Sequence, residues 1–510
     1  MTLLVAGSSE CVGQTPLAVP ANPDSALQTI VGSLDGTPLS LHDAVQSALH
    51  NSTSVLTAEA ALMAAGGARR REAGAFDPTL FFSFDRMNQE LPSVSLFTGN
   101  TNQNTMTGGV RLNLPIGTNI EASLNTVRLE TNSTFAFLNP QYTAYGTVNL
   151  RQPLLGGLFV SAQKNLTKAD RELEAARARY DQEVLAVGTQ VEVSYWDLYA
   201  AERDYAVQKL TRDRAEAFLR DTETRAKTGL IGPNQVANAR TFLAEQEILL
   251  LDREEGLDRI SDELSSLIGK RPDAGKTRLL SVDNPPDDFP IEDADLLVER
   301  SMEKNLALQA AKADVEARRA LSRAAFWEAL PSVDVVGSIG GNGLTGTPQE
   351  VIFLGDTLRT AVSGTSADAV RQAMKRTYPT WSVGIEVTVP IGLRTGLGEQ
   401  DRLDAEVIIA EQRQIQQSRI VEEEVRASYR DLLNGKRRLK AAREGVEAAQ
   451  EQVRIGLIEF QNGRSTAFEL VRLGADFAVA QQRYTQALVR SAKGAANLRQ
   501  LTSGAYLATQ

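Results

Sequence analysis

The sequence predicts a mainly α-helical fold with added β-strands, in which long antiparallel coiled-coil helices alternate with groups of strands. Two long stretches, 164–227 and 399–461, contain no proline and carry apolar residues at a spacing that alternates between three and four. A region with a period of two precedes each stretch, which is typical of strands with one apolar face. Because this order of elements occurs twice, we predict one duplicated unit.

The apolar seams of the two long stretches predict rods that span a distance. The first seam consists of Val184, Val187, Val191, Ser194, Leu198, Ala201 and Tyr205, and the second of Val421, Val425, Ser428, Leu432, Gly435 and Leu439. At a rise of about 1.5 Å per residue, either helix would reach about 95 Å.

Composition excludes several classes of function. The formal net charge of −10 leaves no basic stripe for nucleic acid. One cysteine, Cys11, and two histidines, His42 and His50, provide no cluster with the spacing of a zinc site. The segment 341–346 matches a dinucleotide fingerprint literally, but Thr347 and Pro348 follow where a helix would have to begin. We therefore predict no catalytic residue, cofactor or metal site.

The first half of the chain is predicted to follow an extended N-terminal tail, 1–38. A helix over 40–75 stops before Asp77 and Pro78, and a strand insert covers 78–153. The long helix then ends at Gly229, and Pro233 opens a return helix to residue 268. These elements form the first repeat, 39–269.

The second half repeats this order after a linker, 270–290, that contains several prolines. A helix over 293–329 precedes a strand insert, 331–390, and the second long helix turns at Gly463 into a return helix that ends near Leu501. The second repeat is therefore 291–503, followed by a C-terminal tail, 504–510.

Strands are the one route by which this chain could cross a membrane, since it has no run of about eighteen apolar residues. The segment 378–390 alternates most clearly, and we also expect 79–86 and 142–151 to span, with the middle pair of the first insert extending outward. Candidate interfacial aromatics are Phe81, Phe135, Tyr145, Phe353, Tyr378 and Trp381, for which ordinary sheet packing is the alternative.

The strand count predicts an assembly. A sheet in lipid must close, because exposed backbone groups there cost several kcal/mol each. We expect four spanning strands per chain, whereas closed barrels begin at about eight strands. Several copies would therefore share one β-barrel, and their helices would continue it as a tube.

The ordered set of features resembles the TolC family of outer-membrane efflux proteins. It includes the segment 149–157 before the long helix, Tyr195 with Trp196, Tyr429 with Arg430, and the two glycine turns, and it extends over residues 39–503. The resemblance implies a homotrimer that shares a β-barrel in the bacterial outer membrane and an α-barrel across the periplasm. It also implies partners, namely a periplasmic adaptor (membrane fusion protein) and an inner-membrane transporter, in multidrug efflux or type I secretion.

The resemblance further implies a periplasmic gate. The family carries paired aspartates just after the second turn, and Glu469 and Arg472 occupy these positions. Three copies of Glu469 around an axis would attract cations, and Arg472 would weaken this selectivity by pairing with Glu469. The alternative is an ordinary solvated helix face for both residues.

The same matching assigns three more residues to the closed end, namely Phe460, Asn234 and Gln235. The two turns are the expected docking tips for adaptor, and they comprise Gly229, Leu230, Gly232, Pro233, Gly463, Arg464 and Ser465.

Two functions compete on these grounds. The first is a passive conduit driven by a partner pump, and the second is a periplasmic coiled-coil adaptor or scaffold without a pore. The alternation over 378–390 favours the conduit, because a scaffold needs no membrane-spanning strand.

Overall fold

A computed structural model describes residues 23–90, 100–229, 231–270, 278–290, 292–353, 355–462 and 464–504. Cys11 and two residues of the expected docking tips, Leu230 and Gly463, lie outside the described residues. The chain forms two compact units, of which the first comprises Met1–Ala58, Tyr180–Leu306 and Arg419–Gln510, and the second Glu59–Arg179 and Ala307–Ser418. Each unit therefore draws on both expected repeats.

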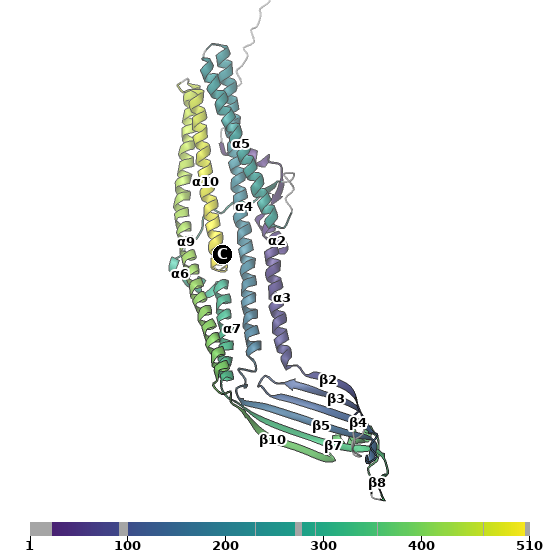
Figure 1. Cartoon of the computed structure of the whole chain (residues 1–510). Helices are drawn as coiled ribbons and strands as arrows, with labels where there is room; N and C mark the ends of the chain where they lie inside the picture. Colours follow the sequence, from purple (N-terminus) through teal and green to yellow (C-terminus); the bar gives the residue numbers. More distant parts are fainter. Residues whose placement is uncertain are drawn as a thin grey trace, which may run out of the picture. The chain divides into compact units, whose positions relative to one another are not determined.

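The first unit contains the return helices and most of the two long helices (Figure 1). Its elements are α1 (Pro23–Gly32), β1 (Thr37–Leu39), α2 (Leu41–Asn51), α5 (Pro233–Leu267), β6 (Leu279–Ser281), α6 (Ala294–Lys304), α10 (Ala467–Leu501) and the greater part of α4 (Lys164–Lys227) and α9 (Arg394–Gln461).

The second unit contains the main sheet and the helices next to it in sequence. Its elements are most of α3 (Thr53–Ala73), η1 (Gly74–Phe76), β2 (Thr79–Gln89), β3 (Thr101–Asn113), β4 (Asn119–Thr131), β5 (Leu138–Leu155), α7 (Leu306–Ala329), β7 (Ser332–Pro348), β8 (Val351–Phe353), β9 (Asp356–Leu358), α8 (Ser366–Met374) and β10 (Tyr378–Thr388). Among the described residues, no helix is both long and apolar enough to cross a membrane.

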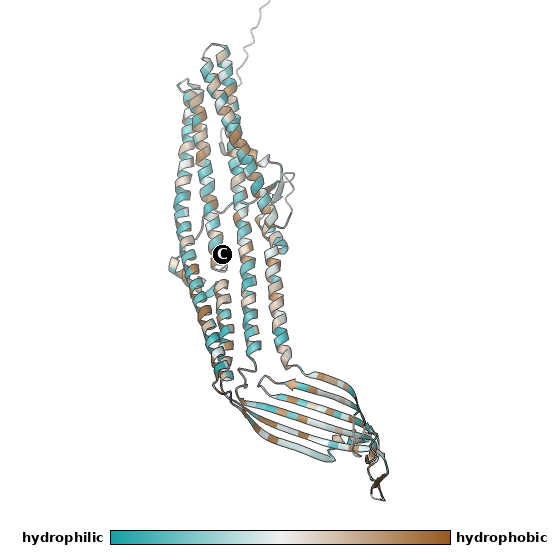
Figure 2. Ribbon diagram, viewed as in Figure 1, coloured by the Kyte–Doolittle hydropathy of each residue, from teal (hydrophilic) through white to brown (hydrophobic). Residues whose placement is uncertain are grey.

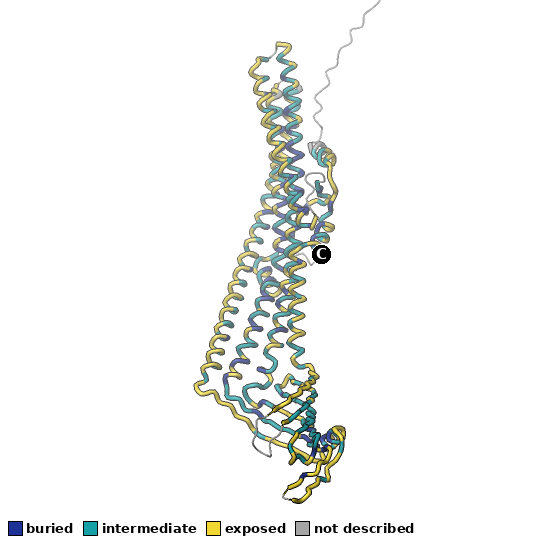
Figure 3. Tube along the Cα trace, turned by 45° about the vertical axis from the view of Figure 1, so that its right-hand side comes forward, coloured by how far each residue is buried: buried dark blue, intermediate teal, exposed yellow. Residues whose placement is uncertain are grey.

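The two long helices confirm the predicted rods. Helix α4 has 64 residues and α9 has 68. Figure 3 shows buried positions recurring along the helices, and the predicted seam residues Val191, Leu198, Val425 and Leu432 are fully or almost fully buried. At Gly435 a Cβ would lie 2.7 Å from the Ser491 hydroxyl, so α9 and α10 pack closely there.

The prediction of an extended tail over residues 1–38 was wrong for the described residues from 23 onward, because they include a helix. Helix α1 forms because Leu27, Ile30 and Val31 share one helical face and Pro23 suits the first helical position. Strand β1 then pairs in parallel with β6, so the expected linker also contains a strand.

Each helix expected to lead into a strand insert is broken in two. The backbone turns extended at Ser52, between α2 and α3, and at Asn305, between α6 and α7. The Asn51 amide donates a hydrogen bond of 3.3 Å to the Ile268 carbonyl, and the Asn305 amide one of 3.0 Å to the Leu501 carbonyl. The sequence around each break has neither proline nor glycine, so the break depends on these distant carbonyls.

The main sheet has the strand order β10-β7-β5-β4-β3-β2, and all its neighbours are antiparallel. The described sheet has six strands, against the four expected to span a membrane, and which of the six span stays a prediction. The middle pair does not leave the sheet, since β3 pairs with β2 and with β4 along its length. Strand β10 confirms the clearest predicted strand.

Register places apolar side chains on one face of this sheet, which we call the apolar face. Figure 2 shows that both hydrophobic and hydrophilic residues occur along the strands. Across the six strands it includes Leu80, Phe82, Phe84, Met106, Val110, Leu112, Ile120, Leu124, Val148, Leu150, Val335, Ile339, Trp381, Val383 and Ile385. Trp381 is 73% exposed and Leu80 83% exposed. Within its own unit the sheet thus leaves an apolar surface uncovered.

The opposite face is polar, and its side chains form hydrogen bonds between strands. Ser338 and Ser382 lie 2.7 Å apart, and Asn125 donates to Thr107 at 3.2 Å. Of the expected interfacial aromatics, Trp381 lies on the apolar face, whereas Phe81 and Tyr145 lie on the polar face by register.

Candidate functional site

The first hairpin end lies between α4 and α5, where the predicted glycine turn is confirmed. Gly229 adopts a φ of +76°, which an L-amino acid with a side chain rarely tolerates, and its N–H donates to the Ala226 carbonyl. Gly232 is the N-cap of α5 and Pro233 its first residue. Gly229, Gly232 and Pro233 are all exposed, so this turn presents backbone and small side chains to its surroundings.

The second hairpin end lies between α9 and α10. The Arg464 N–H donates to the Glu459 carbonyl at 2.9 Å, which closes the last turn of α9. The Thr466 hydroxyl then accepts a hydrogen bond of 3.2 Å from the Glu469 N–H and caps α10. Arg464 is exposed and Ser465 half-buried.

The two residues assigned to the gate form an ion pair. An Arg472 guanidinium nitrogen lies 3.3 Å from a Glu469 carboxylate oxygen, one turn along α10. Their side chains are 62% and 42% exposed, so solvent screens the pair and its worth is about 0–1 kcal/mol. Glu469 also lies in the first turn of α10, where the helix dipole favours a negative charge. A role in gating stays a prediction.

Phe460 joins the two hairpin ends. The Arg225 guanidinium, near the end of α4, lies 5.8 Å from the centre of the Phe460 ring on α9. Asp221 holds Arg225 by an ion pair of 2.9 Å. One further ring contact, at 6.2 Å between centres, joins Phe218 of α4 to Phe468 of α10.

Sequence reasoning missed Arg225, Phe218 and Phe468, although all three lie within a few turns of the predicted glycine turns. Their proximity to the turns was the one feature of the sequence that could have pointed to these three residues. Asn234 and Gln235 are exposed in the first turn of α5, and within the described part of the chain neither side chain forms a hydrogen bond. Their predicted contact with Phe460 therefore remains a proposal.

A half-buried arginine connects α4 to α10 farther from the turns. Arg214 donates a hydrogen bond of 3.4 Å to the Gly474 carbonyl, and burial lowers the pKa of its guanidinium. A Cβ at Gly474 would lie 2.9 Å from an Arg214 nitrogen, so the glycine leaves room for the side chain. A Cβ at Gly456 would overlap Leu473, which indicates an equally close approach of α9 to α10.

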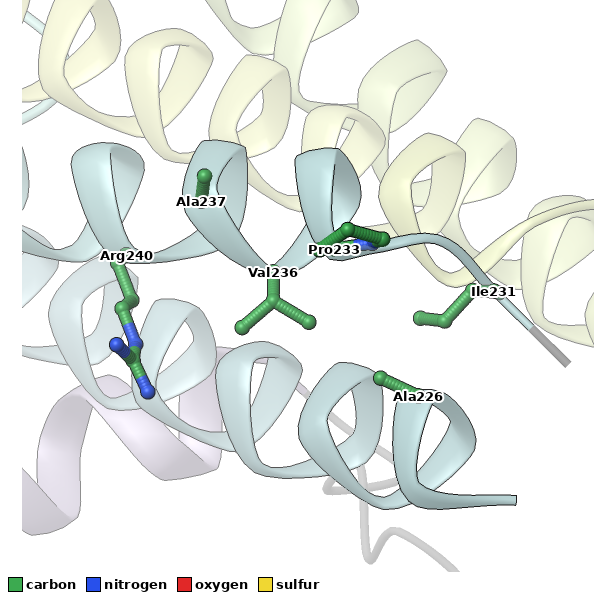
Figure 4. Close-up of a pocket in the computed structure, with 6 residues that line it drawn as sticks. All are labelled: Ala226, Ile231, Pro233, Val236, Ala237 and Arg240. Carbon is green, nitrogen blue, oxygen red and sulfur yellow. The ribbon is translucent and has the colours of Figure 1, made fainter. Parts of the chain in front are cut away.

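A shallow apolar hollow of about 430 Å³ lies at the first hairpin end. Figure 4 shows the Ile231 and Val236 side chains in it beside Pro233, with Arg240 at one end. Arg240 is held by a hydrogen bond of 2.8 Å to Glu223 of α4. The hollow thus offers apolar contact next to a fixed positive charge.

Both hairpins and much of the sheet match a known family model. The model for outer membrane efflux proteins matches residues 119–270 and 297–504, which is well over half of the chain. The chain belongs to the outer membrane efflux protein family.

Solved structures with a similar fold include outer-membrane proteins of this kind. The CmeC outer membrane channel of Campylobacter jejuni is 13% identical, with 92% of this chain and 87% of that chain covered and a TM-score of 0.64. VceC of Vibrio cholerae is 15% identical, with 91% and 96% covered and a TM-score of 0.63. The outer-membrane channel OprN is 18% identical, with 91% and 90% covered and a TM-score of 0.63. Comparison with curated protein sequences found no match.

The efflux-family match includes both hairpin ends and begins at the first residue of β4. Strands β2 and β3 lie outside it, yet they complete the same sheet in this family member. All four described strands of the first insert therefore belong to one sheet.

Proposed function

We propose that this family member is the outer-membrane channel of a tripartite efflux or type I secretion system, through which cargo passes passively from periplasm to exterior. One observation carries the proposal: a six-stranded sheet has an apolar face, exposed over much of its area, and a hydrogen-bonded polar face. A sheet with these two faces suits a wall between lipid and water.

The free edges of the sheet favour an assembly of copies. Strands β10 and β2 each pair on one side within the described chain. An unpaired edge in lipid costs several kcal/mol for each exposed backbone group, and six strands are fewer than the roughly eight of the smallest closed barrels. A homotrimer in which β10 of one copy pairs with β2 of the next closes the barrel.

The helices supply the remaining parts of a conduit. Rods of 64 and 68 residues, at about 1.5 Å per residue, reach about 100 Å and form an α-barrel across the periplasm. The hairpin ends dock the periplasmic adaptor of an inner-membrane transporter through the exposed turns and the hollow beside Val236. Glu469, partly neutralised by Arg472, lines the gate.

Neighbouring substitutions on opposite faces test the membrane assignment. Val383→Lys places a charge on the apolar face and Ser382→Lys places the same charge on the polar face. We expect Val383→Lys to lose about 2–4 kcal/mol of barrel stability and Ser382→Lys much less. Outer-membrane fractionation with unheated gel electrophoresis measures the trimer that survives.

A wild-type chain that fails to sediment with outer membrane, or two variants of equal stability, would reject the channel. The first outcome would favour the periplasmic adaptor or scaffold.

A further inference from the structure

Helix α8 lies on the apolar face of the sheet, where sequence reasoning expected no helix. Ala369 and Ala373 of α8 form a small buried cluster with Ala144 of β5, and Tyr142 and Val370 pack against it. Ala144 shares the apolar face with Val148 and Leu150 by register. The helix therefore covers one end of a surface that is otherwise exposed.

Glycines in β7 leave the space that α8 occupies at this position. A Cβ at Gly343 would overlap the Ala369 carbonyl, and one at Gly341 would overlap the Ala373 carbonyl. Alanine on the helix and glycine on the strand thus let two backbones touch. These are the glycines that imitate a dinucleotide fingerprint in the sequence, and helix packing explains their presence.

Hydrogen bonds fix α8 along the free edge of β7. Strand β10 pairs with β7 only as far as Asn342, and beyond it Gln372 accepts a hydrogen bond of 3.0 Å from the Leu344 N–H. The Thr345 hydroxyl donates to the Thr365 carbonyl at 2.7 Å, and Arg376 donates to the Gly340 carbonyl at 3.2 Å. Gln372 thereby satisfies a backbone N–H of β7 that lies beyond the pairing with β10.

The outward side of α8 is divided into an apolar and a basic half. At about 100° per residue, Met374 falls on one half, next to the half-buried Val370, and Arg371 falls on the other half together with the C-cap Lys375. Met374 is 71% exposed. An apolar half beside a basic half is the pattern of a helix that lies in a membrane interface.

The charges on α8 and the two residues after it are mostly positive, in a chain whose net charge is −10. Arg371 forms an ion pair of 3.0 Å with Asp368, while neither Lys375 nor Arg376 pairs with a carboxylate in the described parts of the chain. Three cations and one carboxylate therefore leave a local excess of positive charge.

We propose that α8 lies in the headgroup layer of the bilayer and that Arg371 and Lys375 bind the phosphates of anionic lipids. The inference rests on the proposed function, because it requires the apolar face to contact lipid. The apolar half of α8 with Met374 then contacts the acyl chains together with the apolar face of the sheet. The basic half contacts the lipid headgroups.

Spin labels on the full-length protein in lipid vesicles test the depth of α8. Each label replaces one exposed residue in a Cys11→Ser background: Met374→Cys on α8, Ile385→Cys on the apolar face and Ser382→Cys on the polar face. We expect the Met374 and Ile385 labels to be accessible to oxygen dissolved in lipid, and the Ser382 label to a water-soluble relaxation agent.

The labels separate the two proposals. A lipid-exposed label at Ile385 with a water-exposed label at Met374 overturns the inference about α8 and leaves the channel intact. Water exposure at both sites overturns both proposals.

The amount of anionic lipid that the protein retains tests the role of the Arg371 and Lys375 charges. Full-length protein is reconstituted in vesicles of phosphatidylcholine and phosphatidylglycerol in equal amounts, extracted, and analysed for bound lipid. We expect Arg371→Gln with Lys375→Gln to lower the retained phosphatidylglycerol at least fivefold, since the loss of even one charge near a membrane surface weakens the attraction for anionic lipid by about that factor.

Lys168→Gln with Arg171→Gln removes two partly exposed charges from α4 and is the matched control. Equal retention by the α8 variant and this control would overturn the lipid-binding proposal.

Discussion

The side-chain amide of Asn305 donates a hydrogen bond of 3.0 Å to the backbone carbonyl of Leu501, the last residue of α10. Asn51 makes the equivalent bond to Ile268, just after α5. Carbonyls at a helix end have no partner within the helix, so each asparagine satisfies one of them. The same contact thus occurs once in each repeat. It joins the break in the helix that leads into the strands to the end of the return helix.

We expect Asn305→Ala to lower the free energy of unfolding by about 1–3 kcal/mol, because its contact is buried. Asn51→Ala removes the same bond from an exposed residue and should cost less. Chemical denaturation of the full-length protein in detergent measures both. Equal losses, or a larger loss for Asn51→Ala, would contradict the prediction that burial makes the Asn305 contact the more stabilising of the two.

Tyr195 ties α4 to the segment between the two halves. Its hydroxyl accepts hydrogen bonds of 3.0 Å from the N–H groups of Val282 and Asp283 and lies 2.9 Å from the Leu39 carbonyl. Burial raises the pKa of Tyr195 to about 12, so the hydroxyl keeps its proton at neutral pH.

We expect Tyr195→Phe to lower the free energy of unfolding by about 1–3 kcal/mol, because two N–H groups lose their acceptor. Tyr199→Phe is the matched control, since its hydroxyl makes a longer contact with Asn284, at 3.3 Å, and accepts no backbone N–H from the described residues. Thermal unfolding of both variants measures the difference. A Tyr195→Phe protein as stable as Tyr199→Phe would contradict this role.

Glu202 is predicted to make stability depend on pH. Its carboxylate is buried and accepts hydrogen bonds from the Ser281 N–H at 2.6 Å and the Ser281 hydroxyl at 2.7 Å. Burial outweighs these bonds and raises the pKa of Glu202 above its ordinary value.

A raised pKa means that the folded chain binds this proton more tightly than the unfolded chain. The contribution of Glu202 to stability should therefore fall as the pH rises from about 4.3, the value for an unfolded chain, through the higher folded-state pKa. The difference in unfolding free energy between Glu202→Gln and wild type should shift in favour of the variant over this range. A difference that stays constant with pH would refute the prediction.

The ion pair between Glu469 and Arg472 predicts that replacing each residue changes cation block in opposite directions. Glu469→Ala should weaken block of the proposed channel by divalent cations, because it removes three negative charges from the proposed trimer. Arg472→Ala should strengthen the block, since it frees Glu469 from its partner at 3.3 Å. We expect changes of severalfold in conductance recordings across planar bilayers.

Asp476→Ala removes an exposed carboxylate farther along α10 and controls for general charge. Unchanged block in the Glu469→Ala channel would exclude a gate at this position.

Local patterns predicted several elements well. Helix α4, the turn at Gly229 and strand β10 each depend on neighbours in sequence, namely a seam, a positive φ and an alternation. Helix α8 was also within reach, because Thr365 and Asp368 form a capping box before an alanine-rich run. The alternation on both sides of it led to an interpretation of the whole insert as strands and loop.

The sequence by itself determined the long rods, their turns, the alternating strands and a family resemblance, because these features arise within a few residues of chain. Only the tertiary structure decided the breaks at Ser52 and Asn305, the membership of β3 and β4 in one sheet, and the position of α8 on its apolar face. Each of these depends on a partner that local periodicity does not encode: a distant carbonyl, a neighbouring strand edge or a glycine that lets two backbones meet.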